Sequence, residues 1–320
     1  MDIIRYRGDM AGKLTMVYNE AVAGVPHCHP VDTRTFSHEL LPATGGKSTR
    51  ERLHSEACLV ATSRGSILGY AHLAAEKPKK KEVEAGTVAG DDPGRGAIRF
   101  LWYRPGRRKA GQELLEASHD YFRERGLERV MAFDQDYRYP FLGFKHSYLS
   151  DAMGHVQALF WSNGYQRVKG EVFLDWPEFE PRTPPEPGFE VETGLELVKG
   201  MGRLPGIKVR ALKDGKQVGI CECLSCAEFS KIDEMEDWAF TQWIGVEEDY
   251  QGRGLGRYLL RRALLELHSI GYRHAAISTD WKNYRAFTFY TNFGYRVVDW
   301  THAYGLDSIP GPGRRKGPSS

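Results

Sequence analysis

The sequence predicts a mixed α+β protein made of two tandem copies of one structural unit. Three observations lead to this prediction. Candidate strands and helices occur on both sides of a proline-rich stretch, a strand in the second half runs into a glycine-rich turn and a helix, and the first half repeats that order. A chain of 320 residues is also longer than one hydrophobic core usually spans, so two domains fit its length.

The overall composition excludes several classes of protein. Forty-four basic residues against 42 acidic ones leave a formal charge of +2, which is too balanced for a nucleic-acid-binding surface across the whole chain. No apolar run approaches the roughly 18 residues of a membrane helix, and the first residues lack the apolar core of an export signal. The five cysteines are an odd number, so we expect reduced thiols in a cytoplasmic protein without nucleic-acid or membrane partners.

A proline-rich stretch marks the boundary between the two units. Residues 177–187, PEFEPRTPPEP, carry five prolines without apolar periodicity and are typical of a semi-rigid linker. We therefore predict an N-terminal unit over 1–176 and a C-terminal unit over 188–307. The Gly- and Pro-rich tail, 308–320, is predicted to be disordered. The charged stretch 76–97, which contains KPKKK, is predicted to be a long solvated hairpin loop.

The second half begins with strands. IKVRAL (207–212) and QVGICECL (217–224) alternate like paired strands across a turn at 213–215. A further strand candidate, WAFTQWIGV (238–246), leads into the glycine turn at 251–256.

A helix is predicted after this turn, followed by a strand, a second helix and a last strand. One apolar face of the first helix repeats at helical period, and Gly271 then ends the helix as a C′ glycine. The apolar positions are Leu255, Leu259, Leu260, Ala263, Leu264 and Leu267. The remaining elements are a strand at 274–279, a helix through 283–294 and a strand at 295–300.

The first half contains a second copy of this order. When Gly111 is aligned with Gly256, further residues match without a gap, namely Leu114 with Leu259, Leu115 with Leu260 and Gly126 with Gly271. Farther along, LFWSNGY (159–165) matches FYTNFGY (289–295), with 15 extra residues in the first copy. Two copies of one unit explain the length better than two unrelated domains.

The turn QGRGLG is predicted to bind an anion. Unpaired N–H groups and the helix dipole face whatever lies at a helix N-terminus, and glycines allow a phosphate to approach the chain. Gly256 is followed by Arg257 and Tyr258, which excludes the Gly-Lys-Ser/Thr loop of NTPases. A dinucleotide-binding turn would need a small residue in place of Arg257. The pattern that remains, Gln/Arg-x-x-Gly-x-Gly/Ala, is satisfied by Gln251, Gly254 and Gly256.

A second motif follows in the next helix. Its pattern, Asn-x-x-Ala-x-x-x-Tyr-x-x-x-Gly-aromatic, is met by Asn283, Ala286, Tyr290, Gly294 and Tyr295. The two motifs, in this order, resemble the GNAT (Gcn5-related N-acetyltransferase) superfamily of acetyl-CoA-dependent enzymes. The resemblance covers roughly 240–297 and extends more weakly over 95–175, as in tandem GNAT proteins. It implies that each unit is a mostly antiparallel mixed sheet flanked by helices.

The resemblance also implies roles for individual residues. The turn would hold the coenzyme A pyrophosphate on its backbone amides, with Arg253 adding charge, and the strand near Val246 would bind the acetyl carbonyl and the pantetheine arm. Tyr290 would protonate the departing thiolate, and Asn283 would contact the cofactor. The implied cofactor-binding residues are Val246, Gln251, Gly252, Arg253, Gly254, Leu255, Gly256 and Asn283.

The general base does not follow from the resemblance. Many family members carry a glutamate six residues before the position of Val246, where this chain has Phe240. Carboxylates nearby are Glu222, Glu236 and Asp237, and a water chain is an alternative. We select Asp237 as the candidate catalytic base.

The two copies differ in the residues that matter for chemistry. Gly254 corresponds to Lys109, and Tyr290 corresponds to Phe160, which has no proton to give. The N-terminal unit is therefore predicted to be a silent copy, and the chain to bind one acetyl-CoA. Residues 188–206 have room for a strand and one short helix, where the family normally has two helices. We therefore expect the N-terminal unit to supply the missing wall of the acceptor pocket.

The predicted function is direct transfer of an acetyl group from acetyl-CoA to a primary amine of a small molecule or peptide. The alternatives are a mycothiol-synthase-like or other acyl-CoA transferase, and a CoA-binding sensor or scaffold without turnover. Cys221-x-Cys223-x-x-Cys226 resembles half a zinc site but has no second pair of ligands, so no metal is predicted. The sequence specifies neither the acceptor nor the oligomeric state.

Overall fold

The computed structural model describes residues 1–45, 51–78 and 94–311, and the chain forms two compact units. Unit 1 contains Met1–Leu142, Ser147–Gly170 and the residues from Thr301 onward. Unit 2 contains Gly143–His146 and Glu171–Trp300. Each unit encloses hydrophobic core of its own.

Unit 1 is built on a sheet with the strand order β1-β2-β3-β4-β5-β13. Neighbours from β1 to β4 pair antiparallel, β4 and β5 pair parallel, and β5 pairs antiparallel with β13. Its elements are β1 (Asp2–Arg5), α1 (Ala11–Val22), α2 (Thr33–Leu40), β2 (Leu53–Ser63), β3 (Ser66–Glu76), β4 (Arg95–Tyr103), α4 (Arg108–Arg123), β5 (Val130–Ala132), β6 (Leu149–Ser150) and α5 (Gly154–Ser162).

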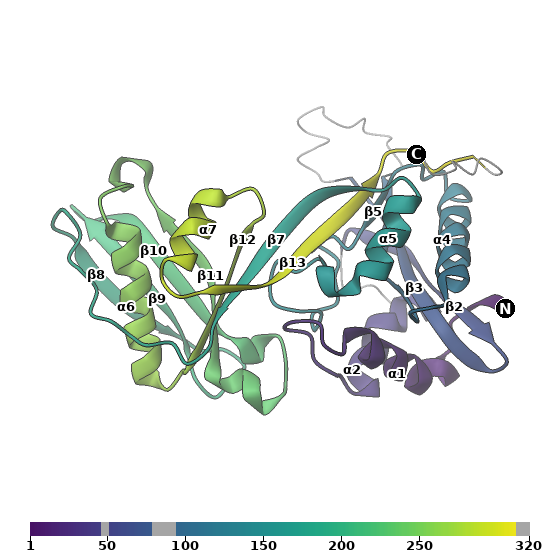
Figure 1. Cartoon of the computed structure of the whole chain (residues 1–320), viewed down its shortest axis with the longest axis horizontal. Coiled ribbons are helices and arrows are strands. Elements are labelled where there is room, and N and C mark those ends of the chain that lie inside the picture. Colours follow the sequence, from purple (N-terminus) through teal and green to yellow (C-terminus); the bar gives the residue numbers. More distant parts are fainter. Residues whose placement is uncertain (46–50, 79–93, 312–320) are drawn as a thin grey trace. The chain divides into compact units, whose positions relative to one another are not determined.

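Unit 2 repeats this topology with the strand order β7-β12-β11-β10-β9-β8. Neighbours from β8 to β11 pair antiparallel, β11 and β12 pair parallel, and β12 pairs antiparallel with β7. Its elements are β8 (Glu192–Val198), β9 (Gly206–Lys213), β10 (Lys216–Ser225), β11 (Trp238–Val246), α6 (Leu255–Ile270), β12 (His274–Asp280) and α7 (Tyr284–Thr291). The predicted fold class, two tandem units with mostly antiparallel mixed sheets and flanking helices, is confirmed (Figure 1).

The last strand of each sheet comes from the other half of the sequence. Strand β7 (Gln166–Trp176) ends the first repeat, yet its residues 171–176 pair with β12 in unit 2. Strand β13 (Arg296–Leu306) ends the second repeat, yet Tyr304, Gly305 and Leu306 pair with β5 in unit 1. The linker at 177–187 separates the two sequence repeats, whereas the compact units divide the chain inside β7 and β13.

The core-facing helix of unit 2 follows the predicted pattern. All six apolar positions of α6 are at most 2% exposed, and the helix packs against β9, β10 and β11 (Figure 1). Gly271 ends the helix with φ +131°, a backbone conformation that favours glycine. In unit 1 the corresponding helix α4 has the same length of 16 residues and is followed by Gly126 with φ +69°.

Three predicted segments differ from the structure or lie partly outside its described residues. The short helix expected within 188–206 is absent: β8 leads through residues 199–205 directly into β9, because KGMGRLP holds two glycines and a proline that disfavour a helix. Strands β3 and β4 form the expected hairpin, but residues 79–93 of its loop lie outside the described residues. In the tail, Ile309 is 8% exposed and donates its N–H to Glu128 O, and 312–320 lie outside the described residues.

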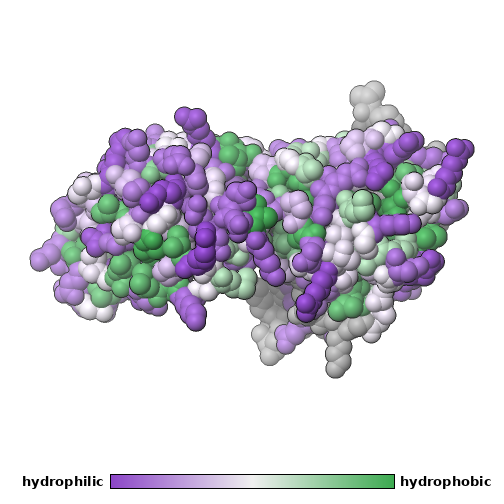
Figure 2. Space-filling view, turned by 90° about the horizontal axis from the view of Figure 1, so that it is seen from below, coloured by the Kyte–Doolittle hydropathy of each residue, from purple (hydrophilic) through white to green (hydrophobic). Residues whose placement is uncertain are grey.

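Polar and apolar residues both contribute to the surface of the described chain. Hydrophilic and hydrophobic side chains are intermixed on the face shown in Figure 2. Within the described part of the chain, no helix is both long enough and apolar enough to cross a lipid bilayer.

The exchanged strands lead to a prediction about stability. Leu174 lies in the first sequence repeat, but it is fully buried opposite Ile277 in unit 2. We expect Leu174→Ala to lower the free energy of unfolding by about 2–5 kcal/mol and to speed amide exchange in β12, because it leaves a cavity in unit 2. Leu159→Ala, in α5 of unit 1, is the matched control. Loss of protection in β4 and α4 rather than β12 after Leu174→Ala would contradict the assignment.

Candidate active site

A fork between two parallel strands is the central feature of unit 2. Strands β11 and β12 pair only from Trp238 opposite His274 to Thr241 opposite Ile277. Strand β11 continues to Val246 because β10 still pairs with it on its other side. Beyond Thr241, no described strand pairs with the edge of β11 that faces β12, so this edge presents backbone groups that can bind a ligand.

A bulge lies just beyond the point where the strands part. Thr241 pairs with Cys223 and Trp243 with Glu222, which leaves Gln242 as the extra residue of β11. Gln242 donates to Glu222 Oε2 at 3.1 Å, and Glu222 also forms an ion pair with Lys208 at 3.2 Å. Glu222, one of the carboxylates considered as a base, is therefore already engaged by Gln242 and Lys208.

The glycine turn follows β11 and has the backbone conformation that its sequence requires. Gly252 and Gly254 have φ values of +74° and +88°, which L side chains rarely adopt. A Cβ built at Gly252 meets no atom within 4 Å, so the space outside the turn is open. Gln251 closes the turn by donating its side-chain amide to Val246 O at 2.9 Å.

The turn leads into a helix whose first N–H groups are available. Gly254 is the N-cap of α6, and no side chain caps the helix. The first helical hydrogen bond is donated by Tyr258 to Gly254 O at 3.0 Å, and no described acceptor is recorded for the N–H groups of residues 252–257. These donors and the positive end of the helix dipole favour an anion at this place.

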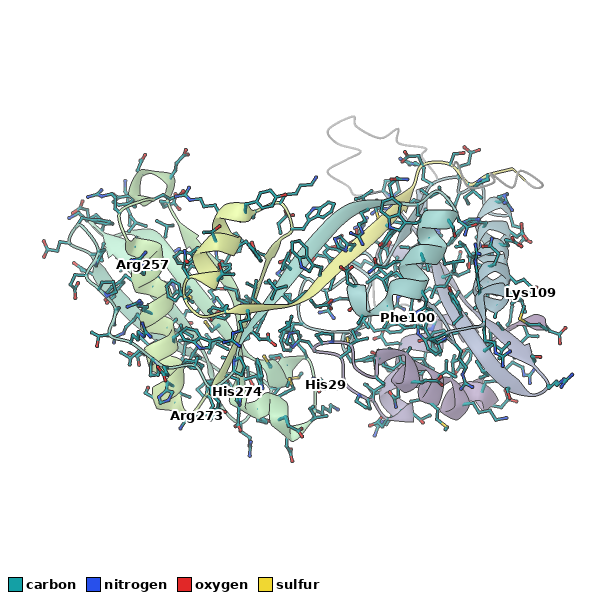
Figure 3. The ribbon with its side chains drawn as sticks, viewed as in Figure 1. His29, Phe100, Lys109, Arg257, Arg273 and His274 are labelled. Atoms are coloured by element: carbon teal, nitrogen blue, oxygen red, sulfur yellow. The ribbon has the colours of Figure 1, made fainter. Side chains whose placement is uncertain are left out.

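Arginines add positive charge around the turn. The guanidinium of Arg253 stacks on Phe189, with Cζ 4.1 Å from the ring centroid. Arg257 extends from the first turn of α6 (Figure 3). Arg285 donates to Gln251 Oε1 at 3.3 Å from the first turn of α7. The sequence motifs did not point to Arg285, although its position two residues after Asn283 places it at the same end of that helix.

Tyr290 has the properties of a proton donor. It lies in α7 and is 5% exposed. Burial, followed by the charges of Cys221 and Glu171, raises the pKa of Tyr290 well above its usual value, so the phenol keeps its proton at neutral pH. Asn283 has a structural role in the same helix, because its Oδ1 accepts the Ala286 N–H at 3.1 Å and caps α7.

The structure does not bring Asp237 to the fork. Arg273 donates its backbone N–H to Asp237 O at 3.0 Å, and Arg273 lies at the opposite end of α6 from Arg257 (Figure 3). Asp237 immediately precedes the start of β11, and five residues of strand, about 16 Å, separate it from the bulge. Its side chain is also 56% exposed.

The position of the family's glutamate is part of the core. Phe240 is fully buried, with its ring centroid 5.3 Å from that of Phe144 and 5.8 Å from that of Phe229. A carboxylate at 240 would be surrounded by aromatic rings, so a base for this site must come from another strand.

Glu171 on β7 is such a carboxylate. It pairs with Asp280 of β12 and accepts a hydrogen bond from Ser278 Oγ at 2.8 Å. Burial, opposed by the bond from Ser278 and assisted by the charge of Asp280, raises the pKa of Glu171 to about 7. Sequence reasoning missed Glu171 because it precedes the linker and was assigned to the other unit.

Unit 1 has a buried ion cluster next to the corresponding end of strand pairing. Pairing of β4 with β5 ends at Ile98 opposite Ala132, and the next residue, Arg99, is 1% exposed. Its guanidinium contacts Glu39 at 2.6 Å and Glu56 at 2.9 Å. Because Glu56 lies on β2, this buried charged cluster extends from β4 across the sheet on the side away from β5.

The glycine turn is also missing from unit 1. Four residues, 104–107, join β4 to α4, whereas eight residues, 247–254, join β11 to α6. Gly111 is retained for packing, because a Cβ there would clash with the Tyr103 ring. Lys109 extends into solvent from the first turn of α4 (Figure 3), and Phe160, in the place of Tyr290, is fully buried.

The cysteine motif forms no cluster of metal ligands. Cys221 and Cys223 are buried, with their Sγ atoms 4.0 Å apart, and Cys223 contacts Thr241 Oγ1 at 3.4 Å. Over the described ranges, no group of three or more His, Cys, Asp or Glu side chains is placed to hold a metal. The thiols therefore pack as part of the core beneath α6 and α7.

The geometry agrees with a known family. Residues 208–297 match the family model of the acetyltransferase (GNAT) domain. This part of the chain is a GNAT domain. No curated protein is significantly similar to the chain in sequence.

Solved structures extend the GNAT fold over both units. A tandem GNAT protein from the clavulanic acid biosynthesis pathway is 13% identical with a TM-score of 0.61, covering 97% of this chain and 99% of that chain. A GCN5-related N-acetyltransferase from Sphaerobacter thermophilus is 14% identical with a TM-score of 0.58, covering 99% and 98%. A glucosamine N-acetyltransferase region of a fungal multi-domain β-N-acetylglucosaminidase is 16% identical with a TM-score of 0.60, covering 95% of this chain and 38% of that one. The chain therefore has the tandem GNAT fold, which supports acyl transfer.

The raised pKa of Glu171 predicts a pH-dependent stability. The carboxyl has a pKa of about 7 in the folded chain and an ordinary value of 4.5. Its contribution to stability is complete below pH 4.5 and is lost as the pH rises through 7. We expect Glu171→Gln to leave the free energy of unfolding unchanged at pH 4.5 and to raise it by about 1–3 kcal/mol at pH 8, measured by denaturant titration. Equal stabilities at pH 8 would contradict the assigned pKa.

Proposed function

We propose that unit 2 is an acetyl-CoA-dependent N-acetyltransferase that transfers the acetyl group directly to a primary amine. The observation that supports this proposal most is the convergence of three parts at the fork. The uncapped turn 251–256 offers N–H donors for a pyrophosphate, the free edge of β11 offers backbone groups for a thioester, and Tyr290 offers a proton. A dinucleotide or nucleotide site would use the turn but would not need the fork or the phenol.

Each part contributes to acyl transfer in a different way. The amides of residues 252–256, with Arg253 and Arg285, bind the pyrophosphate and fix the position of the acyl group. Backbone donors near Val246 stabilise the negative charge that develops on the carbonyl oxygen. Tyr290, which is protonated at neutral pH, gives its proton to the departing sulfur.

The proposal also covers the role of unit 1, the acceptor and the location of the protein. Unit 1 is catalytically silent, because its turn is shortened and Phe160 stands in the place of Tyr290. The acceptor is an amine of a small molecule or peptide, and we propose a cytoplasmic protein without nucleic-acid or membrane partners. The buried Phe240 in place of a glutamate favours one alternative, a CoA-binding sensor without turnover, which a kinetic assay separates from an enzyme.

Tyr290→Phe tests the proton donor. We expect the rate of CoA release with an amine panel to fall roughly 10- to 1000-fold, because the variant lacks the phenolic proton. Acetyl-CoA affinity, measured by calorimetry, should remain nearly unchanged, since the ring and its packing are kept. An unchanged rate would remove Tyr290 from the mechanism, and binding without turnover in the unmodified protein would favour the sensor.

Gly254→Ala tests the turn. A side chain at φ +88° costs about 1–2 kcal/mol and distorts the N–H donors, so we expect acetyl-CoA affinity to fall at least about tenfold. Gly215→Ala, at φ +74° in the turn between β9 and β10, imposes a similar backbone cost away from the site and serves as the control. Calorimetry should show one site per unmodified chain. Equal affinities of the two variants, or two equivalent sites, would contradict the model.

A further inference from the structure

The face on which Glu171 lies is fixed by the alternation of its strand. Val172 and Leu174 belong to the core beneath α6 and α7, whereas Phe173 packs in the separate cluster that contains Phe240. Glu171, two residues before Phe173, is therefore on the same face of the sheet as Phe240. Tyr290 belongs to the core on the other face.

The position of Glu171 along the sheet is fixed by its hydrogen bond. Its carboxylate accepts from Ser278 Oγ, and Ser278 follows Ile277, the last residue of β12 that pairs with β11. The carboxylate therefore lies where the two strands part. The charge of Glu171 reaches Tyr290 and raises its pKa, which is expected for two groups on either side of one fork.

No other carboxylate considered for this role is as well placed. Glu222 is paired with Lys208 and Gln242, and Asp237 lies at the far end of β11. The environment of Glu171 also suits a base at neutral pH, because its pKa is about 7. The charge of Asp280 on β12 acts on the Glu171 carboxyl, and the charge of Glu171 in turn acts on Tyr290 of α7.

We propose that Glu171 is the general base that takes the proton of the amine acceptor, and that β7 carries it into unit 2 from the N-terminal half of the sequence. This inference rests on the acetyltransferase function proposed above. An acyl group in the fork would have the base on one face of the sheet and the acid, Tyr290, on the other.

The proton balance of the reaction follows from these two groups. The amine nitrogen bonds to the carbonyl carbon and loses one proton to the Glu171 carboxylate, and the C–S bond breaks. The sulfur takes one proton from Tyr290. Water then carries the proton from Glu171 to the phenolate of Tyr290, which restores both groups. The products are the amide and CoA with its thiol.

The first test compares two carboxylates on the same strand. We expect Glu171→Gln to lower the rate of CoA release from acetyl-CoA with the amine panel at pH 7.5 by roughly 100-fold or more. Acetyl-CoA affinity by calorimetry should change less than about twofold, which shows that the variant is folded. Asp175→Asn alters the residue four positions farther along β7 on the same face, opposite Ala276, and should keep the full rate.

The second test changes two neighbouring residues, Asp280 and Ser278, which shift the pKa of Glu171 in opposite directions. Asp280→Asn removes a charge that raises the pKa of Glu171, so the acidic limb of the pH–rate profile should move to lower pH. Ser278→Ala removes a hydrogen bond that lowers this pKa, so the limb should move to higher pH. The Asn keeps an oxygen that can accept the Lys282 N–H, as Asp280 Oδ1 does at 2.8 Å. A purely structural role of Glu171 would not produce opposite shifts.

The outcomes separate this inference from the proposed function. Turnover by the unmodified chain together with an unchanged rate and pH profile in Glu171→Gln would overturn the role of Glu171 and leave the acetyltransferase proposal standing. Binding of acetyl-CoA without transfer to any amine in the panel would overturn both. A strong loss of rate in Glu171→Gln, with opposite pH shifts in the two neighbour variants, would establish the base.

Discussion

The site in unit 2 depends on one interruption of backbone hydrogen bonding. Beyond Thr241 and Ile277 the parallel strands β11 and β12 no longer pair, while β10 continues to hold β11 up to Val246. Unpaired peptide groups at such an edge cost free energy unless they find a partner, so the fork must be filled or used. In unit 2 the turn, Tyr290 and Glu171 are arranged around it. In unit 1 the strands part likewise after Ile98, and the next residue, Arg99, is buried in contact with two carboxylates.

The two units show how one backbone can be used for binding or for stability. Buried ions that are paired and hydrogen-bonded tolerate burial, and removing one partner of such a set typically costs about 3–5 kcal/mol. Arg99 with Glu39 and Glu56 is such a set in unit 1. Unit 2 keeps a half-buried carboxylate whose charge is disfavoured and a turn with free donors. Neutralising that carboxylate would stabilise the chain and remove the proposed base, a conflict that is common at active sites.

Local sequence signals predicted the local parts of this structure. Strand β11 lies where the strand candidate WAFTQWIGV was predicted, and helix α6 follows the apolar face that begins at Leu255 and ends at Gly271. Glu171 could not be found in this way, because its place beside β12 results from pairing across the linker. The distance between Asp237 and the bulge also depends on where β11 begins to pair with β12. Sequence spacing describes neighbours along the chain, whereas the base and the fork are defined by partners far away in it.

The exchange of β7 and β13 has a consequence for folding during synthesis of the chain. The outer edge of β5 pairs only when β13 is present, because Ala132 pairs with Tyr304, 172 residues later in the chain. At the ribosome, almost the whole polypeptide is synthesised before the sheet of unit 1 can be closed, and an open strand edge invites pairing with other chains during that time. Such distant pairing also slows folding. The last strand to be synthesised therefore completes the sheet of unit 1, so a chain that ends before Thr301 contains all strands of unit 2 but an unfinished sheet in unit 1.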